Sequence, residues 1–150
     1  MSTMHPKGGE TLVSKLSSNL LDISRLRGEV TPGGPEAVTH DHDGGQYSMQ
    51  HEWSVWKLPA DELKQGFQRL HDELPRQGWR ITQYGPANSE ARQLEINAMH
   101  EKDNVSVYAE LLIRSERKSK DATKSKTDLI HFSVSSPTYR APEGVDPNKY

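Results

Sequence analysis

The chain contains no cysteine, and its 150 residues show no long hydrophobic run and little net charge. The missing cysteine excludes disulfides, thiolate catalysis and zinc or iron–sulfur sites built on cysteine. Basic residues number 19 and acidic residues 21, so a net charge of -2 does not favour binding to DNA or to an acidic membrane surface. No apolar stretch approaches the roughly 18–20 residues of a membrane span, and no signal-peptide pattern follows the first methionine.

Hydrophobic residues are also scarce, at 32% of the chain, against the roughly 45–50% usual in a globular domain when glycine is counted. Their distribution explains the low value. Residues 1–45 and 137–150 are polar and contain most of the proline–glycine clusters, whereas residues 46–136 carry regular apolar patterns. The sequence therefore predicts a polar N-terminal arm and linker, an α+β domain over 46–136, and an extended C-terminal tail.

Five segments of the domain alternate between apolar and polar residues, which predicts half-buried strands. They cover 47–55, 79–84, 94–98, 105–113 and 130–134. Between the first two, apolar residues recur at helical spacing over 60–77, at Leu63, Phe67, Leu70 and Leu74. Pro75 predicts a bent or 3-10 last turn, and Gly78 is placed to end the helix.

This order predicts a five-stranded, mainly antiparallel sheet (β-α-β-β-β-β) with one helix packed on one face. The opposite face is expected to be polar. Its side chains would include Glu95, Asn97, Ser106, Glu110 and Ser133.

The N-terminal arm contains one amphipathic segment, with a short helix expected over about 11–26. Its apolar stripe consists of Leu12, Leu16, Leu20 and Ile23. Helices this short are marginal alone, so the stripe must dock on the chain's own sheet or on a partner. Residues 46–136 already carry all the predicted strands and the helix of the domain without the arm. Association of the stripe with a protein partner or a second copy is therefore preferred. Trp56 is expected to point away from the core, either as a second partner-binding anchor or packed beneath the Leu58-Pro59 corner.

The segment Thr39-His40-Asp41-His42-Asp43-Gly44-Gly45 has the composition of a metal site. Imidazole and carboxylate bind zinc and other divalent ions, and alternation places His40 and His42 on one side of an extended segment. The segment resembles the metal-binding motif of the metallo-β-lactamase fold, but its second His–Asp–His step is incomplete and the chain is too short for that fold. A solvated loop is the preferred interpretation, and a metal site at His40, His42 and Asp43 is the alternative.

Residues 114–126 form the most basic segment, with six basic and two acidic side chains. The candidates for weak anion binding are Arg117, Lys118, Lys120, Lys124 and Lys126. No aromatic residues interleave with them, which argues against specific nucleic-acid binding, and a solvated hairpin tip explains the same composition.

Features of a classical enzyme site are missing from the sequence. Four histidines lie in the domain, at positions 51, 71, 100 and 131, but a catalytic role needs an orienting carboxylate that only the fold can bring close. There is no Gly-x-Ser-x-Gly elbow and no glycine-rich phosphate loop.

The stretches His51-Glu-Trp-Ser-Val-Trp, Leu74-Pro-Arg-Gln-Gly-Trp-Arg and Tyr84-Gly-Pro resemble small α+β proteins and lipoprotein-like domains of actinobacteria. His100-Glu-Lys-Asp-Asn-Val-Ser-Val and Ala141-Pro-Glu-Gly extend the resemblance over about 45–150. It implies a bacterial origin and an exported, membrane-tethered domain, with no activity or catalytic residue attached. The acylated cysteine of a lipoprotein is absent, so either the sequence begins after it or the protein is cytosolic.

Together these features favour a non-enzymatic binding or interaction module of a bacterial protein, without a cofactor. Its binding surface would be the helix-free face of the sheet or the N-terminal arm, and its partner a protein, a small ligand or a second copy. The alternative is a divalent-metal-binding protein or metal-dependent hydrolase built on His40, His42 and Asp43.

Overall fold

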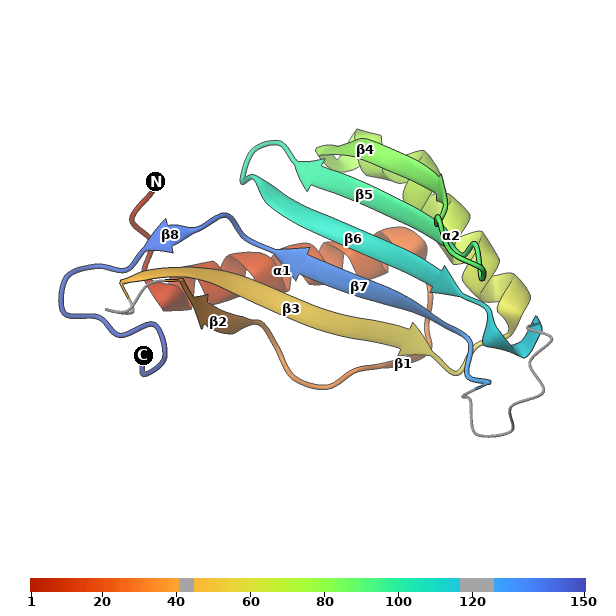
Figure 1. Cartoon of the computed structure of the whole chain (residues 1–150), viewed down its shortest axis with the longest axis horizontal. Coiled ribbons are helices and arrows are strands. Elements are labelled where there is room, and N and C mark those ends of the chain that lie inside the picture. The colour runs from red at the N-terminus through yellow and green to blue at the C-terminus, as the bar shows by residue number, and fades with distance from the viewer. Residues whose placement is uncertain (41–44, 117–125) are drawn as a thin grey trace.

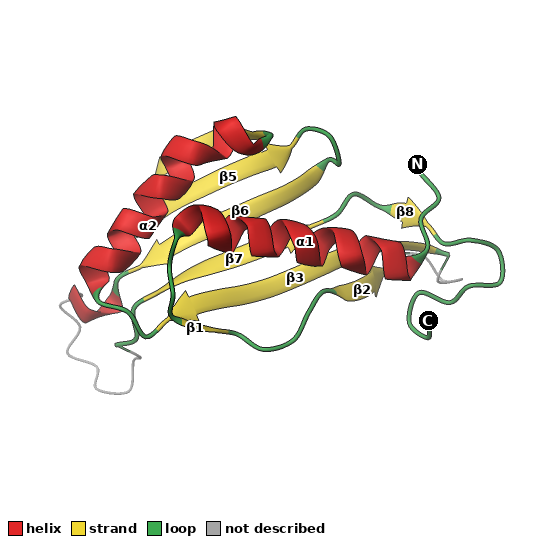
Figure 2. Ribbon diagram, turned by 180° about the vertical axis from the view of Figure 1, so that it is seen from behind, coloured by secondary structure: helices red, strands yellow, loops and turns green. Residues whose placement is uncertain are grey.

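The computed structural model describes residues 1–40, 45–116 and 126–150. They form one sheet with two α-helices on the same face (Figures 1 and 2). The helices are α1 (Pro6–Ser24) and α2 (Ala60–Glu73), followed by the 3-10 segments η1 (Leu74–Gln77) and η2 (Arg114–Glu116). The strands are β1 (Glu29–Val30), β2 (Glu36–Thr39), β3 (Gln46–Trp56), β4 (Trp79–Pro86), β5 (Leu94–His100), β6 (Val105–Leu112), β7 (Leu129–Ser135) and β8 (Tyr139–Arg140).

The α+β class and the mainly antiparallel sheet are confirmed, and among the described residues the sheet has eight strands where the sequence predicts five. The five predicted segments are β3 to β7, and their order across the sheet is β3-β7-β6-β5-β4. The three additional strands, β1, β2 and β8, all pair with β3. They are two to four residues long, which is too short for a period-two pattern to show in the sequence.

Helix α2 forms as predicted. Its apolar stripe, Leu63, Phe67, Leu70 and Leu74, is at most 1% exposed. The last turn is 3-10 over Leu74–Gln77, where Pro75 cannot supply an amide hydrogen for the helical ladder. Gly78 then ends the helix with φ 90°, a backbone conformation that favours glycine. The chain therefore turns into β4 at the residue that the sequence indicates.

Helix α1 corrects the expectation for the N-terminal arm. It lies along β3 and β7 and contacts α2 (Figure 2), so the arm is part of the same packed unit. Leu16, Leu20 and Ile23 are buried in the core, and Leu12 is partly buried against it. The chain's own sheet therefore covers this stripe, where a partner was the preferred expectation.

The width of the sheet explains this arrangement. Five strands about 4.8 Å apart span roughly 19 Å, whereas one helix is about 10–12 Å across. Helix α2 alone therefore cannot cover the core face, and the β3 side would be left in water. That side carries Tyr47, Met49, Trp53 and Val55, all at most 3% exposed beneath α1.

The C-terminal segment is also tied into the sheet. Tyr139 pairs with Tyr47 of β3, and the centroids of their rings lie 5.7 Å apart. Tyr139 and Ala141 are buried, and Thr3 bridges to Arg140. The expected tail over 137–150 is therefore extended, but its first residues belong to the domain.

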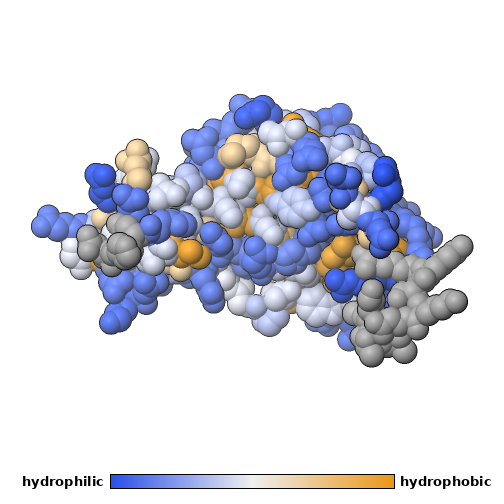
Figure 3. Space-filling view, in the orientation of Figure 1, coloured by the Kyte–Doolittle hydropathy of each residue, from blue (hydrophilic) through white to orange (hydrophobic). Residues whose placement is uncertain are grey.

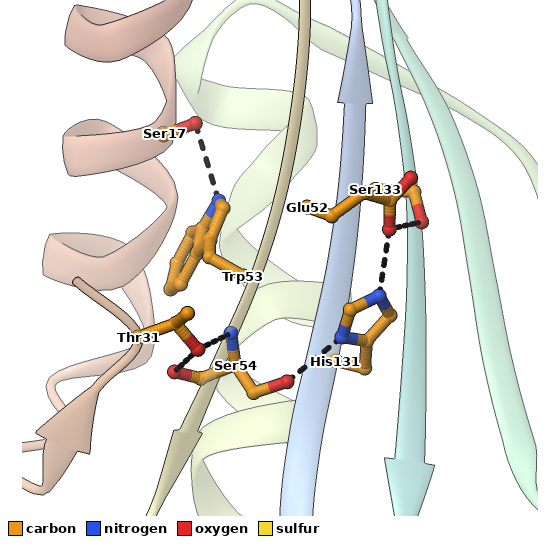
Figure 4. Close-up of polar contacts among 7 residues, drawn as sticks. All are labelled: Ser17, Thr31, Glu52, Trp53, Ser54, His131 and Ser133. Atoms are coloured by element: carbon orange, nitrogen blue, oxygen red, sulfur yellow. Dashed lines mark hydrogen bonds and ion pairs between the residues drawn. The ribbon is translucent and has the colours of Figure 1, made fainter. Parts of the chain in front are cut away.

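Ser17 makes the polar connection between α1 and β3. Its hydroxyl accepts a hydrogen bond from the Trp53 indole Nε1 at 3.2 Å (Figure 4) and lies 2.8 Å from Nδ1 of His51. Because the indole can only donate, the Ser17 hydrogen is left to donate to a neutral His51. Burial lowers the pKa of His51 below 6.5, and this outweighs a hydrogen bond to the Gly33 backbone and the nearby charge of Glu52.

Acidification is accordingly expected to destabilise the protein through His51. The unfolded chain takes up the proton near pH 6.5, whereas the folded chain resists it to a lower pH. The free energy of unfolding should therefore fall as pH drops below 6.5, until the lowered folded pKa is passed. Urea unfolding at pH 8 and pH 5 measures this loss, which should be smaller in His51→Gln. The control His71→Gln, at a partly exposed position of α2, should keep the wild-type loss, and equal losses in all three proteins would contradict the assignment.

Candidate functional site

The face of the sheet opposite α1 and α2 carries no helix among the described residues (Figures 1 and 2). We call it the open face. Along β6 and β7, residues on the core side are buried and the alternate residues remain partly exposed. The predicted polar side chains on β6 and β7, Ser106, Glu110 and Ser133, are among these partly exposed residues, and Glu95 and Asn97 on β5 are partly exposed as well. The expectation of a polar second face is therefore confirmed.

Strand register arranges the open face in rows, because directly paired residues point to the same side of a sheet. One row, the acidic row, contains Ser54, His131, Glu110 and Glu95 on β3, β7, β6 and β5. The next row contains Glu52, Ser133, Tyr108 and Asn97 on the same strands. On the other side of the acidic row lies a third row, formed by Trp56, Leu129 and Leu112, which we call the apolar row.

His131 is held by side chains of the neighbouring strand β3 (Figure 4). Its Nδ1 lies 2.8 Å from the Ser54 hydroxyl and its Nε2 lies 2.7 Å from a carboxylate oxygen of Glu52. The Ser133 hydroxyl donates to the same Glu52 oxygen at 2.7 Å. The imidazole and the carboxylate are therefore fixed in orientation on an otherwise solvent-facing surface.

The Ser54–His131–Glu52 distances match those of a nucleophilic relay, but the surroundings do not complete one. Acyl transfer needs backbone or side-chain donors aimed at a developing oxyanion. The amide of Ser54 already donates to the Thr31 hydroxyl at 2.9 Å, and β3 is paired with β7 on its other side. The Ser54 amide is therefore not free to stabilise an oxyanion next to the Ser54 hydroxyl.

The Tyr108 hydroxyl interacts with the other two glutamates of this region, Glu95 and Glu110. Burial, together with hydrogen bonds to Glu95 and Glu110, raises the pKa of its hydroxyl well above the usual 10. The hydroxyl therefore stays protonated, and its single hydrogen can be donated to only one of the two carboxylates at a time. Gln93 donates to Glu110 at 3.2 Å as well. Glu110 is therefore held by a side chain next to β5.

The electrostatics of the open face are negative. Its four central strands, β3, β7, β6 and β5, contribute Glu52, Glu95 and Glu110 and no lysine or arginine. The paired positions on β1 and β2 add Glu29, opposite Trp56, and Glu36, opposite Gln50. Two arginines lie at the periphery, Arg80 on β4 and Arg140 on β8.

The predicted metal segment is only partly described. The Nε2 atom of His40 lies 2.8 Å from the Ser48 hydroxyl, whereas His42 and Asp43 lie outside the described residues. Within 1–40, 45–116 and 126–150, no three histidine or carboxylate side chains are grouped as metal ligands. The metal hypothesis therefore stays a prediction.

The predicted anion-binding residues cannot be placed as a group. Arg117, Lys118, Lys120 and Lys124 lie outside the described residues, and only Lys126, which is exposed, is described. Trp56 does point away from the core, as expected, since it is partly exposed next to the buried Val55.

The sequence did not indicate which carboxylate would meet which histidine. His100 lies 3.2 Å from Asp103, three residues along the chain. Glu52, however, is 79 residues from His131 and reaches it only through the pairing of β3 with β7. Alternation places both side chains on the open face, but this signal does not set the register between the strands.

No protein-family model, curated protein or solved structure matches this chain. The resemblance to lipoprotein-like domains of actinobacteria stays a prediction. In the part of the chain that the structure describes, no helix is long and apolar enough to cross a membrane. Functional inference therefore depends on the geometry and charge of the open face.

Proposed function

We propose that this protein is a non-enzymatic binding module whose open face binds a positively charged segment of a protein partner. The observation that carries this proposal is a set of three carboxylates, Glu52, Glu95 and Glu110, on β3, β5 and β6, on a face whose four central strands contain no lysine or arginine. Opposite charge steers the approach of a partner and selects against acidic surfaces.

An extended partner fits this surface better than a small molecule does. The hollow on the open face, lined by residues such as Asn97, Tyr108 and Ser133, has a volume of about 190 Å³. Small-molecule sites usually enclose roughly 300–1,000 Å³. The side chains of a sheet face instead offer many shallow contacts to a long segment.

A labelled peptide of alternating lysine and serine tests the proposal by fluorescence titration at low salt. We expect the wild-type protein to bind it and Glu52→Gln/Glu110→Gln to bind about tenfold more weakly, since each exposed ion pair contributes about 0.2–1 kcal/mol. Added salt should weaken wild-type binding, because it screens exposed charges.

The matched control is Glu90→Gln/Glu143→Gln, which removes the same charge from exposed positions in the β4–β5 turn and the C-terminal segment. It should bind like the wild type. Thermal unfolding checks that the open-face variant is folded. Equal affinity of the two double variants would contradict the proposal.

A further inference from the structure

Within the described part of the chain, the apolar row is a group of large hydrophobic side chains that spans three neighbouring strands of the open face. Trp56, Leu129 and Leu112 are partly buried, yet they belong neither to the core nor to the residues packed against it. Hydrophobic side chains show near this end of the sheet, where β3 ends and β7 begins (Figure 3). The row therefore needs an explanation other than support of the core.

The position of the apolar row relative to the carboxylates is regular. Leu112 stands two residues from Glu110 on β6, and Trp56 stands four residues from Glu52 on β3. Two residues of a strand cover about 6.6–6.8 Å. Alternate side chains of any other extended chain repeat at the same distance and point to the same side.

We infer that the bound segment is an extended peptide that places a large apolar side chain on the apolar row and a lysine or arginine two residues away on Glu110. This inference rests on the proposed function and specifies its ligand. A further cation two residues on would face the row that holds Glu52. The recognised pattern is thus an apolar residue followed or preceded, at even spacing, by basic residues.

A second copy of the chain is a poor occupant of the same surface. In a two-fold dimer formed through the open face, the open face of one copy would pack against the open face of the other. Glu52, Glu95 and Glu110 of the two copies would then approach one another, and like charges across an interface are unfavourable. Charge complementarity therefore selects a basic segment over the acidic open face of a second copy.

Three synthetic peptides of equal charge test the inference. They are Ser-Leu-Ser-Lys-Ser-Lys-Ser, the same peptide with serine in place of leucine, and Leu-Ser-Ser-Lys-Ser-Lys-Ser. In the last, the odd spacing turns leucine to the side opposite the lysines. We expect the first peptide to bind about tenfold more tightly than the other two.

Variants of the protein test whether the apolar row causes the preference for the first peptide. Leu112→Ser and Trp56→Ser should abolish the preference for the first peptide and leave the affinity for the leucine-free peptide unchanged. Val30→Ser is the matched control, because Val30 is 37% exposed and pairs with the core-facing Val55, so it lies on the other side of the sheet. This variant should keep the full preference.

The outcomes separate the two proposals. If all three peptides bind equally and Glu52→Gln/Glu110→Gln weakens each of them, the acidic face binds cations and the inference about the apolar row is wrong. A preference that survives in Leu112→Ser and Trp56→Ser overturns it as well. If no peptide binds, the proposed function itself fails.

Discussion

Replacing Phe132 with alanine is expected to lower the free energy of unfolding by about 3–5 kcal/mol. Phe132 is fully buried on β7, which pairs with β3 and β6 in the middle of the sheet. Its ring stacks on Trp53 with 4.1 Å between centroids and 11° between planes. Opposite it on β6 stands Ala109, which is too small to fill the space left by a lost ring.

Urea unfolding followed by tryptophan fluorescence measures this effect. The control is Ser133→Ala, one residue along the same strand but on the open face, where the hydroxyl donates only to Glu52. Its loss should be no more than about 1 kcal/mol, as for a typical exposed hydrogen bond. A loss below about 1 kcal/mol in Phe132→Ala would show that the ring is not part of a packed core.

The second large effect is expected at α1, where Leu20→Ala should cost about 2–5 kcal/mol of stability. Leu20 is 1% exposed, within the core that α1, α2 and β3 share. Truncation leaves a cavity beneath α1 that the packed helices cannot fill by small movements. The matched control is Leu12→Ala, the same change at a partly buried position of the same helix, with a smaller expected loss.

The same variants distinguish docking on the chain's own sheet from docking on a partner. If the stripe serves the chain itself, Leu20→Ala loses stability while its sedimentation coefficient at a fixed protein concentration stays that of the wild type. If the stripe joined two copies, Leu20→Ala would change the sedimentation of the protein and leave the stability of each chain nearly intact.

Local patterns in the sequence predicted the helix and strands whose periods bring residues a few positions apart onto the same face. Leu63, Phe67 and Leu70 recur at helical spacing, so α2 and its buried stripe follow from the sequence. The alternation along β6 predicted that Val107 would be buried and Glu110 partly exposed, as they are. These predictions succeed because helix and strand periods set which side chains share a face.

Contacts between distant segments were not predictable in the same way. Burial of Leu20 depends on α1 packing over β3 and β7, and the helical period of α1 does not state which surface its apolar side covers. The strands β1, β2 and β8 exist because their backbones find partners on β3, although none is long enough to show a period of its own.

The amino-acid sequence by itself determined the α+β class, the position of α2 and the polar character of the open face. Only the tertiary structure decided that α1 belongs to the core, that Glu52 and Ser54 hold His131, and that the apolar row lies beside the carboxylates. The physical reason is register. Sliding one strand by two residues along its neighbour leaves the alternation of both unchanged but changes every cross-strand pair. The pattern therefore selects the face of each side chain, and only the packing of the whole chain selects its neighbours.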